Sequence, residues 1–339
     1  MKGLRLVPEE TNIDFIGKRI IAFAFSAIII LASFFLVATK GLNFGIDFTG
    51  GTVIEVRVPE QPDLTEMRNL LNGLELGVVS IQEFGEPTDL MIRIPEQVED
   101  PEDKEKRLDC LSGASDAANC AKSPQQMAID ITRTSLDERF GEGYVEYRRT
   151  EFVGPQVGEE LKKAGALAVL WSLIGILCYI WFRFEWQFGV AAIIALAHDT
   201  IAIIGLFALT QMEFNLSTVA ALLMIAGYSI NDTVVVFDRI RENLRKYKKK
   251  ALPELFNMSV NQMLSRTLMT SVTTLLALAA LWLFGGEVIR GFVDALIAGI
   301  VIGTYSSVFV ASPVLIYMNI RREAKVDNTA TDQAQTSPS

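Results

Sequence analysis

The sequence predicts a polytopic α-helical membrane protein, with six transmembrane helices in a 1+5 arrangement and an α+β domain between the first two. Six separate apolar runs of about 20 residues occur in the chain, the length that crosses ~30 Å of hydrocarbon. One hydrophilic block separates the first run from the other five. The mean hydropathy of +0.31 conceals these two kinds of sequence, and because no water-soluble core needs six such apolar runs, a soluble globular enzyme is excluded.

The first apolar run covers residues 20–38 and follows Lys18 and Arg19. It is longer than the apolar region of a signal peptide, and no small-residue cleavage site follows it, so we expect an uncleaved transmembrane helix. The other five transmembrane helices are expected over residues 164–182, 188–210, 216–237, 267–285 and 291–318.

Basic residues at the helix ends predict the orientation, because Lys and Arg are retained on the cytoplasmic side of a membrane. The basic groups occur before the first run, after the second, after the fourth and after the sixth, so all of them lie on one side of the membrane. We therefore expect both termini, residues 1–19 and 319–339, to be cytoplasmic and the block 41–163 to be periplasmic. After Val326 the tail has almost nothing apolar and is expected to be disordered.

A basic cytoplasmic loop is expected over residues 238–266. Seven Lys and Arg residues lie between positions 238 and 250. Two interpretations stay open for this run: a solvated loop on anionic lipid, or a docking site for a cytoplasmic partner.

The block 41–163 is expected to be a ferredoxin-like α+β domain. Alternating apolar residues predict strands, and apolar residues at helical spacing predict helices. Their order is β-α-β-β-α-β, that of a split βαβ fold. The elements are expected at residues 52–58, 64–73, 78–84, 89–94, 124–140 and 144–152.

A hydrophilic stretch inside this block, residues 96–123, contains Cys110 and Cys120. In an oxidising compartment two cysteines in one flexible loop can form a disulfide, and two unpaired thiols are the alternative. Cys178 lies in an apolar helix and is expected to be a small buried residue.

Enzymatic chemistry is not expected. The chain has one histidine, His198, and no nucleotide-binding loop, zinc spacing or hydrolase triad. We expect no metal and no cofactor. The net charge of −9 gives no indication of a nucleic-acid partner.

The informative residues are ionisable groups inside the apolar runs, because a charge at the bilayer centre costs at least ~2.5–3.5 kcal/mol. His198 and Asp199 occur halfway along the third run, and Asn231 and Asp232 lie in the fourth. Arg266 stands where the fifth run begins, at a depth expected to match Asp232.

Helical spacing places Tyr228 and Ser229 on the face of Asp232, where they could hydrogen bond to it. An aspartate whose contact with Arg266 varies with conformation could bind and release a proton. The alternatives are a static ion pair for Asp232, and structural hydrogen bonds for Asp199. His198 is either a proton relay or a packing residue. Small residues of the sixth run, Gly299, Gly303, Ser306 and Ser307, indicate close helix packing.

Four motifs stand out: GIDFTGG at residues 45–51, EFVGP at 151–155, AHD at 197–199 and the long stretch GYSINDTVVVFDRIREN at 227–243. Together they resemble the SecD/SecF family of bacterial protein-export membrane proteins, in the resistance-nodulation-division superfamily. The stretch 227–243 is the most specific and resembles the SecF branch, whereas GIDFTGG alone would not separate the SecF branch from the SecD branch. The resemblance covers roughly residues 15–322.

This resemblance implies a half-transporter of the inner membrane that pairs with SecD and uses the proton gradient, without a cofactor. It implies the SecYEG channel, SecA, YajC and unfolded secretory proteins as further partners. Asp232 and Arg266 match family positions that line the proton path, facing an aspartate of SecD, and the role of Asp199 is less defined. The insertion at 96–123 departs from the family pattern. A non-transporting translocon scaffold and half of a related exporter are the alternative functions.

Overall fold

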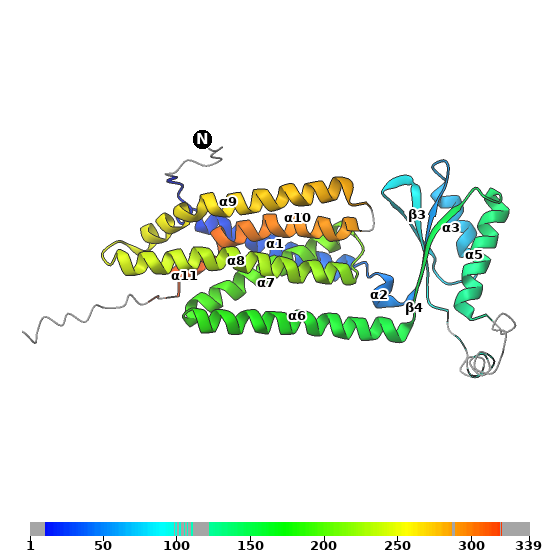
Figure 1. Cartoon of the computed structure of the whole chain (residues 1–339), viewed down its shortest axis with the longest axis horizontal. Coiled ribbons are helices and arrows are strands. Elements are labelled where there is room, and N and C mark those ends of the chain that lie inside the picture. The colour runs from blue at the N-terminus through cyan, green and yellow to red at the C-terminus, as the bar shows by residue number, and fades with distance from the viewer. Residues whose placement is uncertain are drawn as a thin grey trace, which may run out of the picture.

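The computed structural model describes residues 11–97, 122–286 and 289–318, together with positions 99, 102, 105, 107, 110 and 320. A bundle of long helices and a smaller α+β domain lie end to end along the long axis of the molecule (Figure 1). The predicted disorder of the tail falls outside the described residues.

Six helical spans in the described part of the chain are long and apolar enough to cross a membrane. One precedes the α+β domain and five follow it, which confirms the predicted 1+5 arrangement. They are α1 (Arg19–Lys40), α6 (Pro155–Arg183), α7 (Trp186–Thr210), α8 (Leu216–Lys246), α9 (Leu252–Phe284) and a sixth span made of α10 (Arg290–Ser306), the π-helix η3 (Ser307–Ala311) and α11 (Ser312–Ile316).

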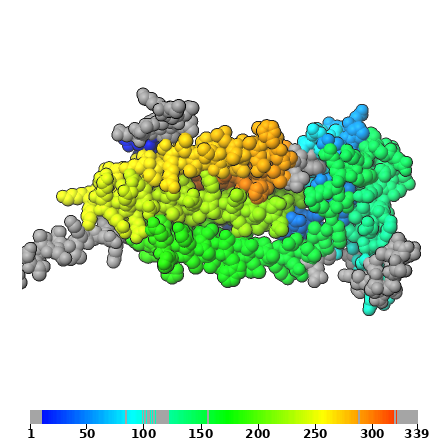
Figure 2. Space-filling view, viewed as in Figure 1, coloured from blue at the N-terminus to red at the C-terminus, as the bar shows by residue number. Residues whose placement is uncertain are grey.

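The spans divide into a central and a peripheral set. In α7, α8 and the sixth span, 56%, 50% and 61% of the apolar stretch is buried, against 17%, 11% and 17% in α1, α6 and α9. Figure 2 shows the peripheral α6 along one edge of the bundle. The exposed apolar side chains of this set, such as Trp181 and Phe284, are typical of lipid-facing or partner-facing surfaces.

The α+β domain has one four-stranded antiparallel sheet in the order β2-β3-β1-β4. This is the strand order of a ferredoxin-like domain, so that prediction is confirmed. Buried Ile54, Leu90 and Ile92 of the sheet share one core with Met67 and Leu136 of the two helices. The elements are β1 (Gly51–Arg57), α3 (Leu64–Asn72), β2 (Ser80–Phe84), β3 (Glu86–Ile94), α5 (Pro124–Phe140) and β4 (Glu146–Val153).

The expected basic loop at 238–266 is mostly helix. α8 continues to Lys246 and α9 begins at Leu252, so the link between them is short. Lys, Arg and Glu are good helix formers, and an apolar run marks the membrane-spanning part of a helix rather than its end. The extended parts pack together: Asn243 donates to Ser259 Oγ at 2.8 Å, and Leu244 shares a core with Leu255.

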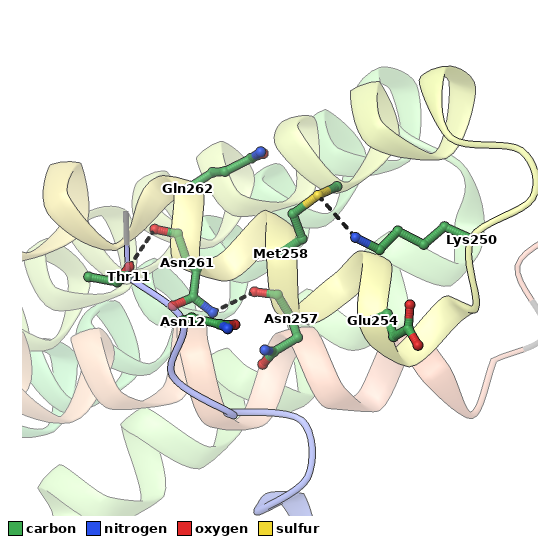
Figure 3. A pocket seen from close by; sticks show the side chains of 8 residues that line it. All are labelled: Thr11, Asn12, Lys250, Glu254, Asn257, Met258, Asn261 and Gln262. Carbon is green, nitrogen blue, oxygen red and sulfur yellow. Dashed lines mark hydrogen bonds between the residues drawn. The ribbon is translucent and has the colours of Figure 1, made fainter. Parts of the chain in front are cut away.

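The chain segment before α1 is held by two side-chain amides of α9 (Figure 3). Asn257 Oδ1 accepts from the backbone N–H of Phe15 at 2.8 Å, and Asn261 both accepts from and donates to the backbone of Ile13. A polar cavity of about 460 Å³ adjoins this contact. Because the two amides bind the chain's own backbone, we assign them a structural role.

Candidate functional site

Asp199 lies at the centre of the bundle and is fully buried. Its Oδ2 accepts hydrogen bonds from Ser229 Oγ of α8 at 2.5 Å and from Ser306 Oγ of the sixth span at 2.7 Å. The carboxylate therefore joins three helices through hydroxyl donors, which satisfy a buried acceptor at a site where water is scarce.

His198 lies beside Asp199 and contacts it, although neighbouring side chains on a helix point about 100° apart. Nδ1 of the ring is 3.0 Å from Asp199 Oδ1, and the side chain is 2% exposed. Nε2 is buried and has no hydrogen-bond partner among the described residues. The ring centroid is 6.1 Å from that of Tyr305, whose hydroxyl donates to the backbone of α1 at Ala22.

Asp232 forms a second carboxylate centre nearer the α8–α9 link. Thr267 Oγ1 of α9 donates to its Oδ1 at 2.6 Å, and Ser307 Oγ of the sixth span donates to its Oδ2. Its partners thus come from two of the helices that pack against α8, namely α9 and the sixth span.

Arg266 precedes Thr267 in the chain and lies beside this second centre. Its side chain is exposed, and across the described residues no ion pair within 4.0 Å joins it to Asp232. Its positive charge acts on the carboxylate through space. The guanidinium is therefore available at the surface of α9, where a second group could approach it.

Two expectations about the neighbours of Asp232 are corrected. Ser229 binds Asp199 instead of Asp232, and the hydroxyl of Tyr228 is 3.5 Å from Ser271 Oγ. Asn231 is exposed. Residues three apart on a helix differ by about 60° in direction, enough for Ser229 and Asp232 to contact different neighbouring helices.

Ser306 and Ser307 are functional candidates that the sequence analysis treated only as small packing residues. They are the last residue of α10 and the first of η3. Ser312 Oγ donates to the backbone oxygen of Ser307 at 3.0 Å, across the π-helical turn. π-Helical turns inside α-helices occur frequently at functional sites. The sequence signal that could have identified them is the presence of two consecutive serines inside an apolar run.

The GIDFTGG motif forms a joint between the α+β domain and the bundle. Residues Ile46–Thr49 make a short helix, α2, and Asp47 Oδ2 accepts from the backbone N–H of Leu216, the first residue of α8, at 2.9 Å. A parallel backbone bridge links Phe44 to Phe214 in the α7–α8 link. The start of α8, and hence the helix that carries Asp232, is therefore held by this motif.

An ion pair reinforces the joint. Arg93 of β3 bonds Glu213 of the α7–α8 link at 2.5 Å, and both side chains are largely buried. Glycine is required nearby: a Cβ on Gly45 would lie 2.4 Å from Glu213 Oε1, and one on Gly51, at φ +111°, would lie 2.6 Å from the oxygen of Ile94. Gly45 thus permits close approach of the motif to the α7–α8 link, and Gly51 permits close approach of β1 to the end of β3.

The described residues include two cysteines, Cys110 and Cys178. Cys110 is disulfide-bonded, whereas Cys120 lies outside the described residues. Cys178 is exposed on α6 and not buried as expected, because this helix lies at the periphery. Among the residues that the structure describes, no group of three His, Cys, Asp or Glu side chains could hold a metal ion.

Comparison with protein-family models gives two matches. Residues 134–321 match the C-terminal region of the protein export membrane protein SecD/SecF, and residues 35–58 match the SecD/SecF GG motif. The first match covers the membrane segment with Asp199 and Asp232, and the second covers the joint.

Similar proteins are known in sequence and in structure. The chain is 46% identical to protein translocase subunit SecF of Rickettsia felis over 324 residues, 95% of this chain and 97% of that protein. It is 47% identical to the Rickettsia akari subunit over 312 residues, 92% and 94% of the two chains.

The crystal structure of SecDF from Thermus thermophilus, a translocon-associated membrane protein, matches with TM-score 0.74 and 34% identity. The match covers 93% of this chain and 40% of that one, so this chain spans well under half the length of SecDF. The super-membrane-facing form of SecDF matches with TM-score 0.63 over 91% of this chain and 39% of that one. The chain belongs to the SecD/SecF family of protein export membrane proteins, as a SecF.

Proposed function

We propose that this chain pairs with SecD and uses the proton-motive force to assist the translocation of proteins through SecYEG in the bacterial inner membrane. The observation that carries the proposal is the pair of carboxylates inside the helical bundle, Asp199 and Asp232, bound by the adjacent hydroxyls of Ser306 and Ser307. Intramembrane carboxylates are costly and mark proton relays in pumps and transporters.

Protonation would change the hydrogen bonding at Asp232. An ionised carboxylate only accepts, and Thr267 and Ser307 supply two donors. A protonated carboxyl also donates through one oxygen, so one of the two hydroxyls must turn or leave. Because Ser306 adjoins Ser307, a movement of this turn also reaches Asp199. A charge that crosses ~100 mV carries about 2.3 kcal/mol, sufficient to shift a two-state helix equilibrium.

Movement of α7 and α8 would be transmitted to the α+β domain through the joint. Asp47 holds the first residue of α8, and Arg93 holds Glu213 in the middle of the α7–α8 link. In this proposal the domain acts on unfolded secretory proteins at the outer surface, and proton flow through the bundle moves it.

SecD is the proposed direct partner, since the similar solved structures are SecDF and this chain covers about 40% of their length. The exposed face of α9, which carries Arg266, is the proposed contact surface. A carboxylate of SecD would there pair with the guanidinium. SecA and YajC are proposed further partners, and no cofactor, metal, nucleic acid or enzymatic step is required because the gradient is the energy source.

The proposed orientation follows the basic residues. The start of α1, the end of α6 and the α8–α9 link lie at the end of the bundle away from the α+β domain (Figure 1). The basic residues Lys18, Arg183 and the run 239–250 belong to these helix ends or adjoin them. Both termini are accordingly cytoplasmic and the domain is periplasmic. This topology is that of half a transporter of the resistance-nodulation-division superfamily.

The main alternative is a scaffold that assembles the translocon without moving protons. The observation that favours it is that both carboxylates already have hydroxyl donors, as static buried groups do. Half of a related exporter is a third possibility with the same bundle.

Asp232→Asn in the full chain, produced with SecD, separates these functions. The control is Asp294→Asn, at a half-buried carboxylate of α10 that accepts a hydrogen bond from Trp282. We expect Asp232→Asn to co-purify with SecD and to lose gradient-dependent export of a secretory protein into membrane vesicles, whereas the control retains it. Normal export by Asp232→Asn would favour the scaffold.

A further inference from the structure

An apolar cavity of about 350 Å³ lies between α6, α7 and α8, beside the aromatic cluster of the joint. This volume is within the range of ligand pockets, ~300–1,000 Å³. Its walls are almost entirely apolar. They include Phe48, Gly165, Val169, Ile204, Val219 and Leu222.

The cavity extends along the helices from the edge of the membrane span toward its middle. Lys162, at one end, directly precedes the apolar stretch of α6, and Thr200, at the other, is 14 residues into the 25-residue helix α7. The Thr200 hydroxyl donates to the backbone oxygen of Leu196 at 2.9 Å, so it offers no free donor to the cavity. The lining thus favours an apolar occupant that lies parallel to the helices.

The lysine at the mouth is chemically suited to a phosphate. Lys163 pairs with Glu159 at 2.8 Å, but Lys162 has no carboxylate within 4.0 Å among the described residues. Its ammonium group is 5.5 Å from the ring centroid of Phe44, which positions it over the cavity mouth. A cation at the membrane edge above an apolar slot matches the charge distribution of a phospholipid.

We propose that this cavity binds one acyl chain of a bilayer phospholipid, whose phosphate contacts Lys162. α6 lies at the edge of the bundle, so a chain can enter sideways from the hydrocarbon (Figures 1 and 2). Gly165 lies at a narrow part of the cavity: a Cβ there would meet Val219 at 3.9 Å and Phe48 at 4.0 Å, in ordinary van der Waals contact, so a larger side chain at this position would project into the cavity. The bound lipid would fill the gap between α6 and the central helices. This inference does not depend on proton coupling.

The test uses the full chain, with the partner that co-purifies, in vesicles of phosphatidylethanolamine and phosphatidylglycerol. The probe is a phosphatidylethanolamine with a diazirine at the middle of its acyl chain, and labelled residues are identified by mass spectrometry after illumination. We expect label at Val169 and Leu222 in the cavity, in excess over the outward-facing Trp171 and Leu170 of α6.

Matched variants separate a bound lipid from the surrounding bilayer. Gly165→Leu fills the cavity, whereas Gly175→Leu on the same helix points into open space. The leucine side chain would take the place of several methylene groups of the bound acyl chain. Labelling of the cavity should therefore fall at least about tenfold in Gly165→Leu and not in Gly175→Leu. Val169→Phe fills the slot from another position and should act likewise. Lys162→Gln should lower labelling about fivefold.

Each other outcome overturns the proposal. Equal labelling of the cavity and the outward face would mean ordinary boundary lipid. Absence of label in the cavity, with the same residues cross-linked to SecD or to a translocating chain, would assign the slot to that protein. The two leucine variants must have the same midpoint of thermal unfolding in mild detergent. If Val169→Phe is folded and Leu222 is labelled as strongly as in wild type, the label does not come from a lipid in the cavity.

Discussion

Ser306 and Ser307 are neighbours in the chain, yet their hydroxyl groups bind carboxylates on two different helices, Asp199 of α7 and Asp232 of α8. The boundary between α10 and the π-helix η3 falls between them. A change of helical register at this point would alter both contacts together. The two carboxylates are therefore linked through a single backbone segment, without direct contact between their side chains.

Ser307→Ala should weaken this link. It removes one of two donors to Asp232, and a buried acceptor that loses a partner costs about 1–3 kcal/mol. We expect a lower midpoint of thermal unfolding in detergent and reduced gradient-dependent export. Ser217→Ala, at an exposed position of α8, is the control and should change neither. Wild-type export by Ser307→Ala would show that the hydroxyl is dispensable.

The joint should behave as a coupled unit. Arg93→Gln and Glu213→Gln each leave a largely buried charge unpaired, and residues in direct contact give interaction energies of about 0.5–3 kcal/mol. In a double-mutant cycle the double variant should be less destabilised than the sum of the single variants. The readout is hydrogen exchange of the α7–α8 link, residues 211–215. Strict additivity would contradict a direct role of the ion pair.

The α+β domain should lose stability in acid because of Asp89. Arg57 donates to both carboxylate oxygens, at 2.5 and 2.6 Å, and this contact holds the pKa of Asp89 below its usual value. A carboxyl with a lowered pKa in the folded state stabilises it fully above the unfolded value of about 3.9, and that contribution is lost as the pH falls toward the folded value. This group therefore contributes stability at neutral pH that is lost in acid.

Pulse proteolysis in urea, with cleavage measured inside residues 51–153, tests this prediction on the full chain. In wild type the domain should become more sensitive to proteolysis as the pH falls from about 4 toward the lower pKa that Asp89 has in the folded state. Asp89→Asn should be less stable at neutral pH, because Arg57 loses its contact with both oxygens of Asp89 and keeps only Glu86 as a carboxylate partner, and it should lose this pH dependence. An unchanged acid response in Asp89→Asn would assign the sensitivity to other carboxyls.

The sequence predicts the architecture well because the relevant signals are local. Apolar length predicts the six spans, and period-two alternation predicts strands such as β1 and β3. The end of α8 was different: apolarity stops near Phe237, but the helix continues to Lys246 because charged residues with high helix propensity follow. Hydropathy reports the environment of a helix and not its length.

The candidate site could be predicted only in part. Buried Asp199 and half-buried Asp232 are recognisable from the apolar residues around them in the sequence, but their partners depend on how each helix is rotated about its axis. Ser229 faces α7 and binds Asp199, although its spacing from Asp232 also allowed the other assignment. Ser306 and Ser307 come from a span over 70 residues away in sequence, and no periodicity in the chain identifies such a contact.

The central claim is that Asp232 changes protonation as the helices move, and infrared difference spectroscopy tests it most directly. The sample is the complex with SecD in sealed vesicles, measured with and without an imposed proton gradient, for wild type and Asp232→Asn. We predict that the gradient changes the carbonyl stretch of a protonated carboxyl in wild type and that this signal is absent in Asp232→Asn. A wild-type spectrum with no gradient-dependent carboxyl band, in a complex that still exports protein, would contradict the account.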